Sequence, residues 1–489
     1  MAIKDIREWI ELLEKEGELA RVKTEVDWDL EIGGVFRETM DRGGPALLFE
    51  NIKGYNTPDA KCKRLFCGSL ATYPRVALML GLAKDTPYPE LIKAWRERTK
   101  NPIKPVNVSD GPCKENILKG NDVDLYLFPT PHWQKRDGGR YIGTFHGVIT
   151  KDPDTGWENM GMYRQVIHDK NTSSVSVAQG QHIWMHWRKY RPRKQNMPLA
   201  VVIGWEPVMT AVSATPLPVG MDEWDIIGAL RREPVELVKC ETVDLRVPAS
   251  SEIVLEGEVI TDVHTFKNDG PFGEFTGYYG LPSMRPVFKV NCITFRSDPI
   301  FQGTLTGLPI TEDHRISAVK NSAMVWDLLE ERMTGVTGVN CDPSVGLTNC
   351  IVQIDNSYYG QVHQAAANIW GSKMALDAGK NIIVVDPDVD IYDLSRVFWA
   401  LAYRVDPTRD IHQYPGWIHA LDPIVHVKDP GALGPGGNKG TRLLIDATKS
   451  IDRPRADEYE GGRFALVAYP DEETMKKVRD NWEKYGVKA

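Results

Sequence analysis

The strongest constraint on the fold is a series of apolar, β-branched runs in the middle of the chain. Residues 199–205 are continuously apolar, whereas residues 253–260 and 286–293 alternate in part between apolar and polar side chains. Such runs are typical of strands, and few helical patterns separate them. We therefore expect this region to form an antiparallel barrel or sandwich rather than a doubly wound parallel sheet.

The pattern changes near residue 313, where strand-like and helical segments begin to alternate. Helical patterns cover residues 316–333, 358–377 and 394–403, and strand-like runs cover residues 345–354 and 381–386. This alternation favours an α/β domain with some parallel strand pairing. A loop rich in glycine and proline follows at residues 429–437. A helix predicted over residues 472–485 carries an apolar stripe, which must pack on the chain's own core or on a partner subunit.

The N-terminal part is predicted to mix helices and strands. Residues 5–19 form an amphipathic helical pattern with Asp5 as a possible N-cap, residues 46–49 are a short buried strand, and residues 89–98 are helical. A connector rich in proline and valine follows. We therefore expect a multidomain protein of mixed α+β and α/β class. Its predicted parts are an N-terminal α/β domain, a strand-rich central domain and a C-terminal α/β domain, at residues 1–110, 111–312 and 313–489.

Composition excludes several classes of protein. A length of 489 residues suits about three domains. A net charge of -8 argues against a nucleic-acid binder, and no apolar run is long enough for a membrane span. The first residues lack the apolar core of a signal peptide, and the seven cysteines form no CxxC pair. We expect reduced thiols in a cytoplasmic protein that binds neither nucleic acid nor membrane.

Two carboxylates bracket a predicted turn. Asp269 and Glu274 lie five residues apart, and the residues between them are Gly-Pro-Phe-Gly. Glycine and proline favour a rigid turn over a helix or regular strand. Such a turn can keep one carboxyl neutral and the other ionised, which is the requirement of general acid–base chemistry. Taken alone, the same pattern also describes an ordinary solvated loop.

Three residues upstream form a candidate metal-binding set. Asn159, His182 and Glu223 would offer an amide oxygen, an imidazole and a carboxylate. This combination suits Mn²⁺ or Mg²⁺ better than Zn²⁺, for which thiolates or several histidines are usual. Because the three are far apart in sequence, their spacing alone does not distinguish ligands from ordinary core or surface residues.

Taken together, these patterns resemble the UbiD family of reversible decarboxylases in order and spacing. The matching features are spread over most of the chain and are densest between residues 137 and 279. They are Asp-Gly-Gly-Arg-Tyr-Ile at 137–142, Asn159 with Arg164, Gln181-His182, Pro216-x-Pro218-x₄-Glu223, Ser-Glu-Ile-Val-Leu-Glu-Gly at 251–257 and Gly-Pro-Phe-Gly-Glu at 270–274.

The resemblance implies prenylated FMN as cofactor, bound by a central split β-barrel domain. Asn159, His182 and Glu223 would hold Mn²⁺ or Mg²⁺, which bridges the cofactor phosphate to the protein. A K⁺ site would involve Glu223 and the carbonyl of Ser213, with Arg404 beside it, and Lys373 would meet the phosphate. The residues expected to contact the cofactor are Met162, Tyr163, Arg164, Gln181, His182, Ser213, Ala214, Thr215, Pro216, Glu223 and Lys373.

The resemblance also assigns catalytic roles. Arg164 would orient the substrate carboxylate, Glu274 would donate the proton after CO₂ leaves, and Asp269 would pair with Arg164. Ferulic-acid-type members have glutamate at the position of Asp269. Because aspartate is one methylene shorter, its pair with Arg164 must be closer or less direct. His419 lies where hydroxybenzoate-type relatives have a histidine near the substrate, and it could equally be a structural histidine in a loop.

The implied function is reversible, non-oxidative decarboxylation of an aromatic or α,β-unsaturated carboxylic acid. A flavin prenyltransferase would supply the cofactor, and the C-terminal domain would assemble the protein as a homodimer or homohexamer. Two alternatives remain open at this point. Split barrels also bind plain FMN in ordinary oxidoreductases, and the chain could be a non-catalytic subunit of a larger carboxylase.

Overall fold

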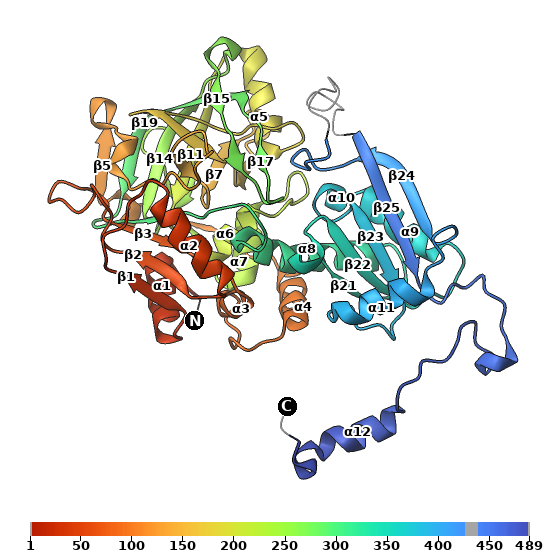
Figure 1. Ribbon diagram of the computed structural model, residues 1–489. Coiled ribbons are helices and arrows are strands. Elements are labelled where there is room, and N and C mark those ends of the chain that lie inside the picture. The colour runs from red at the N-terminus through yellow and green to blue at the C-terminus, as the bar shows by residue number, and fades with distance from the viewer. Residues whose placement is uncertain (1, 426–438, 488–489) are drawn as a thin grey trace.

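The computed structural model describes residues 2–425 and 439–487 (Figure 1). The predicted loop at residues 429–437 lies outside these ranges. Within them, no helix has both the length and the apolar character that crossing a bilayer requires.

The N-terminal region is a small four-stranded sheet covered by helices. The strand order is β1-β2-β3-β20, with bounds Leu19–Val22, Ala46–Phe49, Arg64–Cys67 and Ile300–Gln302. Its helices are α1 (Ile6–Lys15), α2 (Glu31–Asp41), α3 (Tyr73–Met79) and α4 (Tyr88–Thr99). The predicted helices near residues 5–19 and 89–98 and the strand at 46–49 are confirmed. Strand β20 pairs with β3, so the central part of the chain returns to complete this sheet.

A curled nine-stranded sheet forms the central domain (Figure 1). Its strand order is β6-β9-β10-β19-β14-β11-β7-β8, and β5 pairs with β19. The bounds are β5 Asn116–Lys119, β6 Tyr141–Gly143, β7 Gly147–Lys151, β8 Glu158–Gly161, β9 Gln165–Asp169, β10 Thr172–Ser174, β11 Met197–Ile203, β14 Ile253–Val259 and β19 Val287–Phe295. These strands pair antiparallel, which confirms the expected class of sheet.

Short elements around this sheet carry most of the candidate site residues. The helices are α5 (His182–Tyr190), α6 (Pro207–Ser213) and α7 (Glu223–Arg231). Two hairpins pair β15 (Lys267–Asp269) with β18 (Ser283–Arg285) and β16 (Phe272–Gly273) with β17 (Tyr279–Gly280). A further sheet joins β13 (Arg246–Pro248), β12 (Glu236–Lys239) and β4 (Val106–Asn107).

Helix α8 (Glu312–Glu330) leads into the C-terminal α/β domain. Its sheet has the order β21-β22-β23-β25-β24, with bounds Val336–Asn340, Asn349–Ile354, Asn381–Val385, Lys439–Ala447 and Ile411–Trp417. Strands β22, β23 and β25 are parallel, as the alternating pattern predicts, and the two outer strands are antiparallel. The single helix expected over residues 358–377 is divided into α9 (Gln361–Trp370) and α10 (Met374–Asp377), and α11 spans Leu394–Arg404.

The C-terminal arm, residues 451–487, extends away from this domain (Figure 1). Helix α12 (Glu472–Asp480) is shorter than predicted, and a 3₁₀ turn at Trp482–Tyr485 follows it. Neither element has a buried residue. The apolar stripe of the arm therefore does not pack on the core of its own chain.

Candidate active site

The two acids of the predicted turn converge on one arginine. Asp269 ends β15 and Glu274 directly follows β16, so the Gly270–Gly273 turn brings both carboxylates to the same place. Arg164 Nε donates to Asp269 Oδ2 at 3.1 Å, and its Nη1 donates to Glu274 Oε1. Gly270 has a φ of 106°, which is a left-handed conformation that favours glycine.

This cluster is shielded from solvent. Asp269 is 0% exposed and Glu274 is 9% exposed. Arg164 therefore offers one positive charge to two buried carboxylates. In such surroundings charge interactions are stronger than in water, so a third negative group that approaches Arg164 would favour proton uptake by one of the acids. The shorter aspartate reaches Arg164 directly.

The three candidate metal ligands also converge. Asn159 lies in β8, whereas His182 and Glu223 are the first residues of α5 and α7. Asn159 Nδ2 donates to Glu223 Oε1 at 2.8 Å and lies 3.2 Å from His182 Nδ1. His182 Nδ1 lies 3.8 Å from Glu223 Oε1. Octahedral ligand atoms that bind a cation at about 2.1 Å lie about 3 Å apart, so this set fits Mn²⁺ or Mg²⁺ once the Asn159 amide turns its oxygen inward.

Lys373 reaches this cluster from the C-terminal domain. It precedes α10, and its Nζ lies 2.6 Å from His182 Nε2 and donates to the Leu217 carbonyl at 2.6 Å. Burial lowers the pKa of Lys373. The two domains therefore meet at the candidate metal site, and Lys373 places an amino group beside it.

Seven of the eleven expected cofactor residues form two neighbouring stretches. Met162 N–H donates to the Ser213 carbonyl at 3.1 Å, which brings residues 162–164 beside residues 213–216. The latter stretch contains Ser213, Ala214, Thr215 and Pro216. Nearby, Gln165 Nε2 and Thr210 Oγ1 are buried and have no hydrogen-bond partner among the described residues. A polar ligand such as a flavin would satisfy such groups, so the donor set fits the expected cofactor.

Gln181 lies directly before His182, whereas Arg404 lies elsewhere in the fold. Gln181 is exposed at the N-cap of α5, where its Oε1 accepts from the Ala178 N–H at 3.1 Å. Arg404 is not beside Glu223 or Ser213, which corrects the expectation for the K⁺ site. It ends α11 and pairs with Asp386 and Asp388 at 3.1 and 2.9 Å. In sequence, nothing distinguished this structural ion pair from a cofactor contact.

His419 lies against the acid turn. Its ring packs edge-on against Phe275, the residue after Glu274, with ring centroids 5.0 Å apart. Its Nδ1 accepts from the Leu421 N–H at 3.1 Å, so the proton of the neutral ring is on Nε2. Burial lowers the pKa of His419, which favours this neutral form. The Nε2–H group is thus a candidate donor to a substrate oxygen.

Several residues that support the acid turn had no role assigned to them from the sequence. Tyr141 donates to Asp269 Oδ1 at 3.0 Å, and Asp137 accepts from the Gly273 N–H at 3.2 Å. His314 Nε2 lies 2.7 Å from the Phe275 carbonyl. In the sequence, the feature that could have indicated a role for Asp137 and Tyr141 was their place in the motif at residues 137–142.

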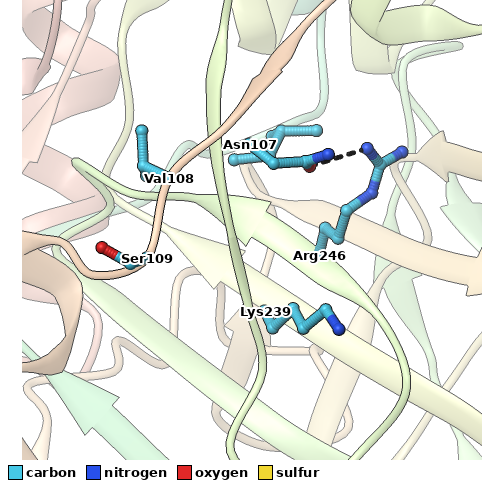
Figure 2. Close-up of a pocket in the computed structure, with 6 residues that line it drawn as sticks. Asn107, Val108, Ser109, Lys239 and Arg246 are labelled. Atoms are coloured by element: carbon cyan, nitrogen blue, oxygen red, sulfur yellow. Dashed lines mark hydrogen bonds between the residues drawn. The ribbon is translucent and has the colours of Figure 1, made fainter.

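A separate cavity of about 270 Å³ lies beside β4, β12 and β13 (Figure 2). Arg246 Nη1 donates to Asn107 Oδ1 at 3.0 Å across it, as Figure 2 shows. Arg246 also donates to Glu158, the neighbour of Asn159, at 2.7 Å. This cavity has none of the acid-turn or metal-set residues in its lining, and its arginine anchors the strand that carries Asn159.

Three family profiles match most of the chain. The 3-octaprenyl-4-hydroxybenzoate carboxy-lyase N-terminal domain matches residues 10–95, the Rift-related domain of the same enzyme matches residues 104–309, and its C-terminal domain matches residues 314–447. The three profiles follow the three structural regions in order.

Curated relatives match over nearly the full length. The chain is 34% identical to a phenolic acid decarboxylase of Sedimentibacter hydroxybenzoicus, over 92% of each chain. It is 31% identical to the pyrrole-2-carboxylic acid decarboxylase of Pseudomonas aeruginosa, over 99% of this chain and 98% of the relative.

Solved structures agree with these matches. Vanillic acid decarboxylase of S. hydroxybenzoicus in its closed form superimposes with a TM-score of 0.87 at 31% identity, over 99% of this chain and 100% of that one. A UbiD-class enzyme of Pelotomaculum thermopropionicum, in an evolved dimeric form in complex with prFMN, superimposes with a TM-score of 0.79 at 27% identity, over 96% and 98% of the two chains.

Proposed function

This chain belongs to the UbiD family of carboxy-lyases, and from that premise we propose that it catalyses reversible, non-oxidative decarboxylation of an aromatic or α,β-unsaturated carboxylic acid with prenylated FMN. The observation that carries this proposal is the arrangement of Asp269, Arg164 and Glu274. An ordinary flavin oxidoreductase transfers hydride and has no evident use for two buried acids around one arginine.

Arg164 orients the substrate by its carboxylate. A guanidinium offers paired N–H donors that match the two oxygens of a carboxylate. Arrival of this third negative charge favours the neutral form of Glu274, which then holds a proton next to the bond that breaks. After CO₂ leaves, Glu274 gives this proton to the substrate carbon, and in the carboxylation direction it removes the proton. Asp269 stays paired with Arg164 and keeps the guanidinium in place.

Prenylated FMN, when bound, supplies the electron sink that loss of CO₂ from an sp² carbon requires. Asn159, His182 and Glu223 would hold Mn²⁺ or Mg²⁺ beside its phosphate, with Lys373 as a second cation and K⁺ near Glu223. The stretches around Tyr163 and Ser213 would line the cofactor, and a flavin prenyltransferase would supply it.

His419 would contact the ring of the substrate. Its Nε2–H can donate to a hydroxyl oxygen on an aromatic ring, and Phe275 offers an apolar edge beside it. An aromatic acid with one carboxylate would let Arg164 bind the carboxylate and His419 meet the ring, and the names of the phenolic and pyrrole-2-carboxylic acid decarboxylases are those of aromatic acids. The seven cysteines all lie in the described part of the chain and are free, which is consistent with our proposal of a cytoplasmic enzyme.

The first test is reconstitution. The protein is produced with a flavin prenyltransferase and Mn²⁺ without oxygen, and its intact non-covalent mass and visible spectrum are recorded. A bound mass of FMN plus a five-carbon prenyl unit is expected. Loaded protein is then assayed for CO₂ release from 4-hydroxybenzoate, vanillate, pyrrole-2-carboxylate and cinnamate. Plain FMN as the bound flavin, with oxidation of a reduced nicotinamide, would favour the oxidoreductase instead.

Two variants separate chemistry from cofactor binding. Glu274→Gln removes the proton donor and is expected to lower kcat by at least about a hundredfold with unchanged flavin content. His182→Ala removes a metal ligand and is expected to lose the flavin itself, as measured by bound mass and absorbance. Full decarboxylase activity in Glu274→Gln would show that another group donates the proton.

A further inference from the structure

We propose that Asp137 and Tyr141 are positioning residues. They fix the positions of the two acids of the active site, Asp269 and Glu274. The inference rests on the proposed function for its kinetic consequence. Its structural basis is a set of contacts between the loop and strand at residues 134–141 and the turn at residues 269–274. We call residues 134–141 the clamp segment.

Tyr141 holds the first acid. Its hydroxyl donates to Asp269 Oδ1 at 3.0 Å, while Arg164 Nε donates to Asp269 Oδ2 at 3.1 Å. The Tyr141 ring packs on Phe272, with ring centroids 4.2 Å apart, and the residue is 0% exposed. The carboxylate of Asp269 therefore has a donor on each oxygen. Loss of either donor would let the carboxylate rotate, and Asp269 would then no longer hold the guanidinium group of Arg164 in one orientation.

Asp137 holds the second acid through the backbone. Its Oδ1 accepts from the N–H of Gly273, the residue immediately before Glu274, at 3.2 Å. Its Oδ2 accepts from the Gln134 N–H at 3.0 Å, which closes the clamp segment on itself. Burial raises the pKa of Asp137 to about 6. A buried carboxyl is costly unless it is hydrogen-bonded, and the N–H groups of Gly273 and Gln134 supply one bond to each oxygen of Asp137.

Glycines allow the two segments to approach. Gly138 N–H donates to the Pro271 carbonyl at 2.7 Å. A Cβ at Gly138 would lie 2.4 Å from the Gly270 carbonyl oxygen, and a Cβ at Gly273 would lie 2.4 Å from Gln134 Nε2. Backbone therefore packs on backbone at Gly138, and at Gly273 the backbone packs on the side chain of Gln134. The clamp segment therefore fixes both ends of the acid turn. Tyr141 bonds the side chain of Asp269 at one end, and Asp137 bonds the Gly273 N–H, just before Glu274, at the other.

A simple role in stability does not account for this arrangement. Phe272 and the ring of Tyr141 already fill the apolar space, so the hydroxyl adds a contact only to Asp269 and the Pro271 carbonyl. Tyr141→Phe keeps the ring and removes only this contact. The variant therefore separates packing from the orientation of Asp269.

The kinetic test uses Tyr141→Phe and Asp137→Asn in the cofactor-loaded enzyme. Each is expected to lower kcat about tenfold, the effect of one lost buried hydrogen bond, with KM and flavin content within about twofold of wild type. The matched controls are Tyr88→Phe, which removes a hydroxyl bonded to the Ala318 carbonyl, and Asp152→Asn, whose carboxylate accepts from the Asp154 N–H. Both controls are expected to retain wild-type kcat.

A second readout does not depend on turnover. Hydrogen–deuterium exchange of the peptides spanning residues 133–137 and 269–275 is expected to be at least about tenfold faster, in one or both peptides, in Asp137→Asn than in wild type or Asp152→Asn, because asparagine keeps only one acceptor oxygen for the N–H groups of Gly273 and Gln134. Wild-type kcat in Tyr141→Phe, or unchanged exchange in Asp137→Asn, would overturn the inference. If Asp137→Asn fails to fold, the kcat of Tyr141→Phe decides. If the wild-type protein releases no CO₂ from any acid, the proposed function fails. The hydrogen–deuterium exchange measurement then still shows whether the clamp segment holds the turn at residues 269–274.

Discussion

At the scale of single residues, two fully buried acids differ in their hydrogen-bond and ion-pair partners. Asp269 and Glu206 are both 0% exposed. Asp269 receives direct hydrogen bonds from Arg164 and Tyr141. Glu206 has Arg231 only at 3.8 Å and accepts one N–H bond, from Val208 at 2.8 Å. Burial accordingly raises the pKa of Glu206 to about 7, and Arg231 opposes this shift only in part.

Glu206 should make stability depend on pH. The native carboxyl keeps its proton up to about pH 7, whereas an unfolded glutamate loses it near 4.5, so the native state binds more protons between these values. The stability from that proton is present at low pH and is lost as pH rises through about 7. Relative to Glu206→Gln, the wild-type free energy of unfolding should fall by about 1 kcal/mol between pH 6 and pH 8.

Denaturant unfolding of both proteins at the two pH values measures this difference. The exposed Glu233→Gln serves as control, because its stability relative to wild type should be the same at both pH values. An equally constant difference for Glu206→Gln would show that Glu206 is ionised throughout this range.

At the scale of elements, local signals define helices more reliably than their ends. The N-cap predicted at Asp5 is confirmed, because its carboxylate accepts from the N–H groups of Arg7 and Glu8 at 2.9 Å each. The same carboxylate also accepts from Arg296 Nη1 at 2.7 Å, a contact that sequence spacing could not foresee. The first helix is thus fixed both to its own first turn and to the central domain.

Asp5→Ala should lower the free energy of unfolding by about 1–2 kcal/mol, because the first turn of α1 loses its cap. Asp5→Asn keeps the cap and loses only the charge, so its effect should be about half as large. Urea unfolding followed by circular dichroism provides the measurement. The exposed Glu11→Ala on the same helix should stay within about 0.5 kcal/mol of wild type. Equal effects of Asp5→Ala and Glu11→Ala would exclude a capping role.

At the scale of the whole molecule, the proposed active site is built by more than one domain. The central domain supplies the acids, Arg164 and the metal set, while Lys373 and His419 come from the C-terminal domain. The arm at residues 451–487 instead leaves its domain (Figure 1). Its exposed apolar side chains include Leu466, Val467, Tyr469, Trp482, Tyr485 and Val487. An amphipathic helix with no buried residue in the described part of the chain suits packing against a second copy.

Removal of residues 466–489 should therefore lower the oligomeric state. Light scattering coupled to gel filtration should give a multiple of the 55.0 kDa chain for the full-length protein and a smaller mass for the truncated one. Trp482→Glu should act in the same direction, because it places a charge in the apolar stripe, whereas Lys484→Glu should not. Equal masses for full-length and truncated protein would show that the arm does not hold subunits together.

The sequence by itself determined the class of each domain and most of its elements. The β-branched runs at residues 253–260 and 286–293 became β14 and β19 of the antiparallel sheet, because β-branched side chains pack well on a pleated surface, and both strands are buried over most of their length. The alternating pattern after residue 313 became three parallel strands with helices between them. The turn at Gly270 and Pro271 followed from glycine and proline, whose backbone preferences are local, whereas Phe272 and Gly273 form the short strand β16.

Only the tertiary structure decided which of these residues meet. The single helix expected at residues 472–485 ends at Asp480, and β20 joins a sheet more than two hundred residues upstream, since pairing over that distance leaves no local signal. Arg404 and Arg164 are both arginines with acidic partners, yet one closes a structural ion pair and the other stands between two acids of the site. Charge and residue type are properties of the sequence. Distance, burial and hydrogen-bond partners, which decide what those charges do, arise only when the chain is folded.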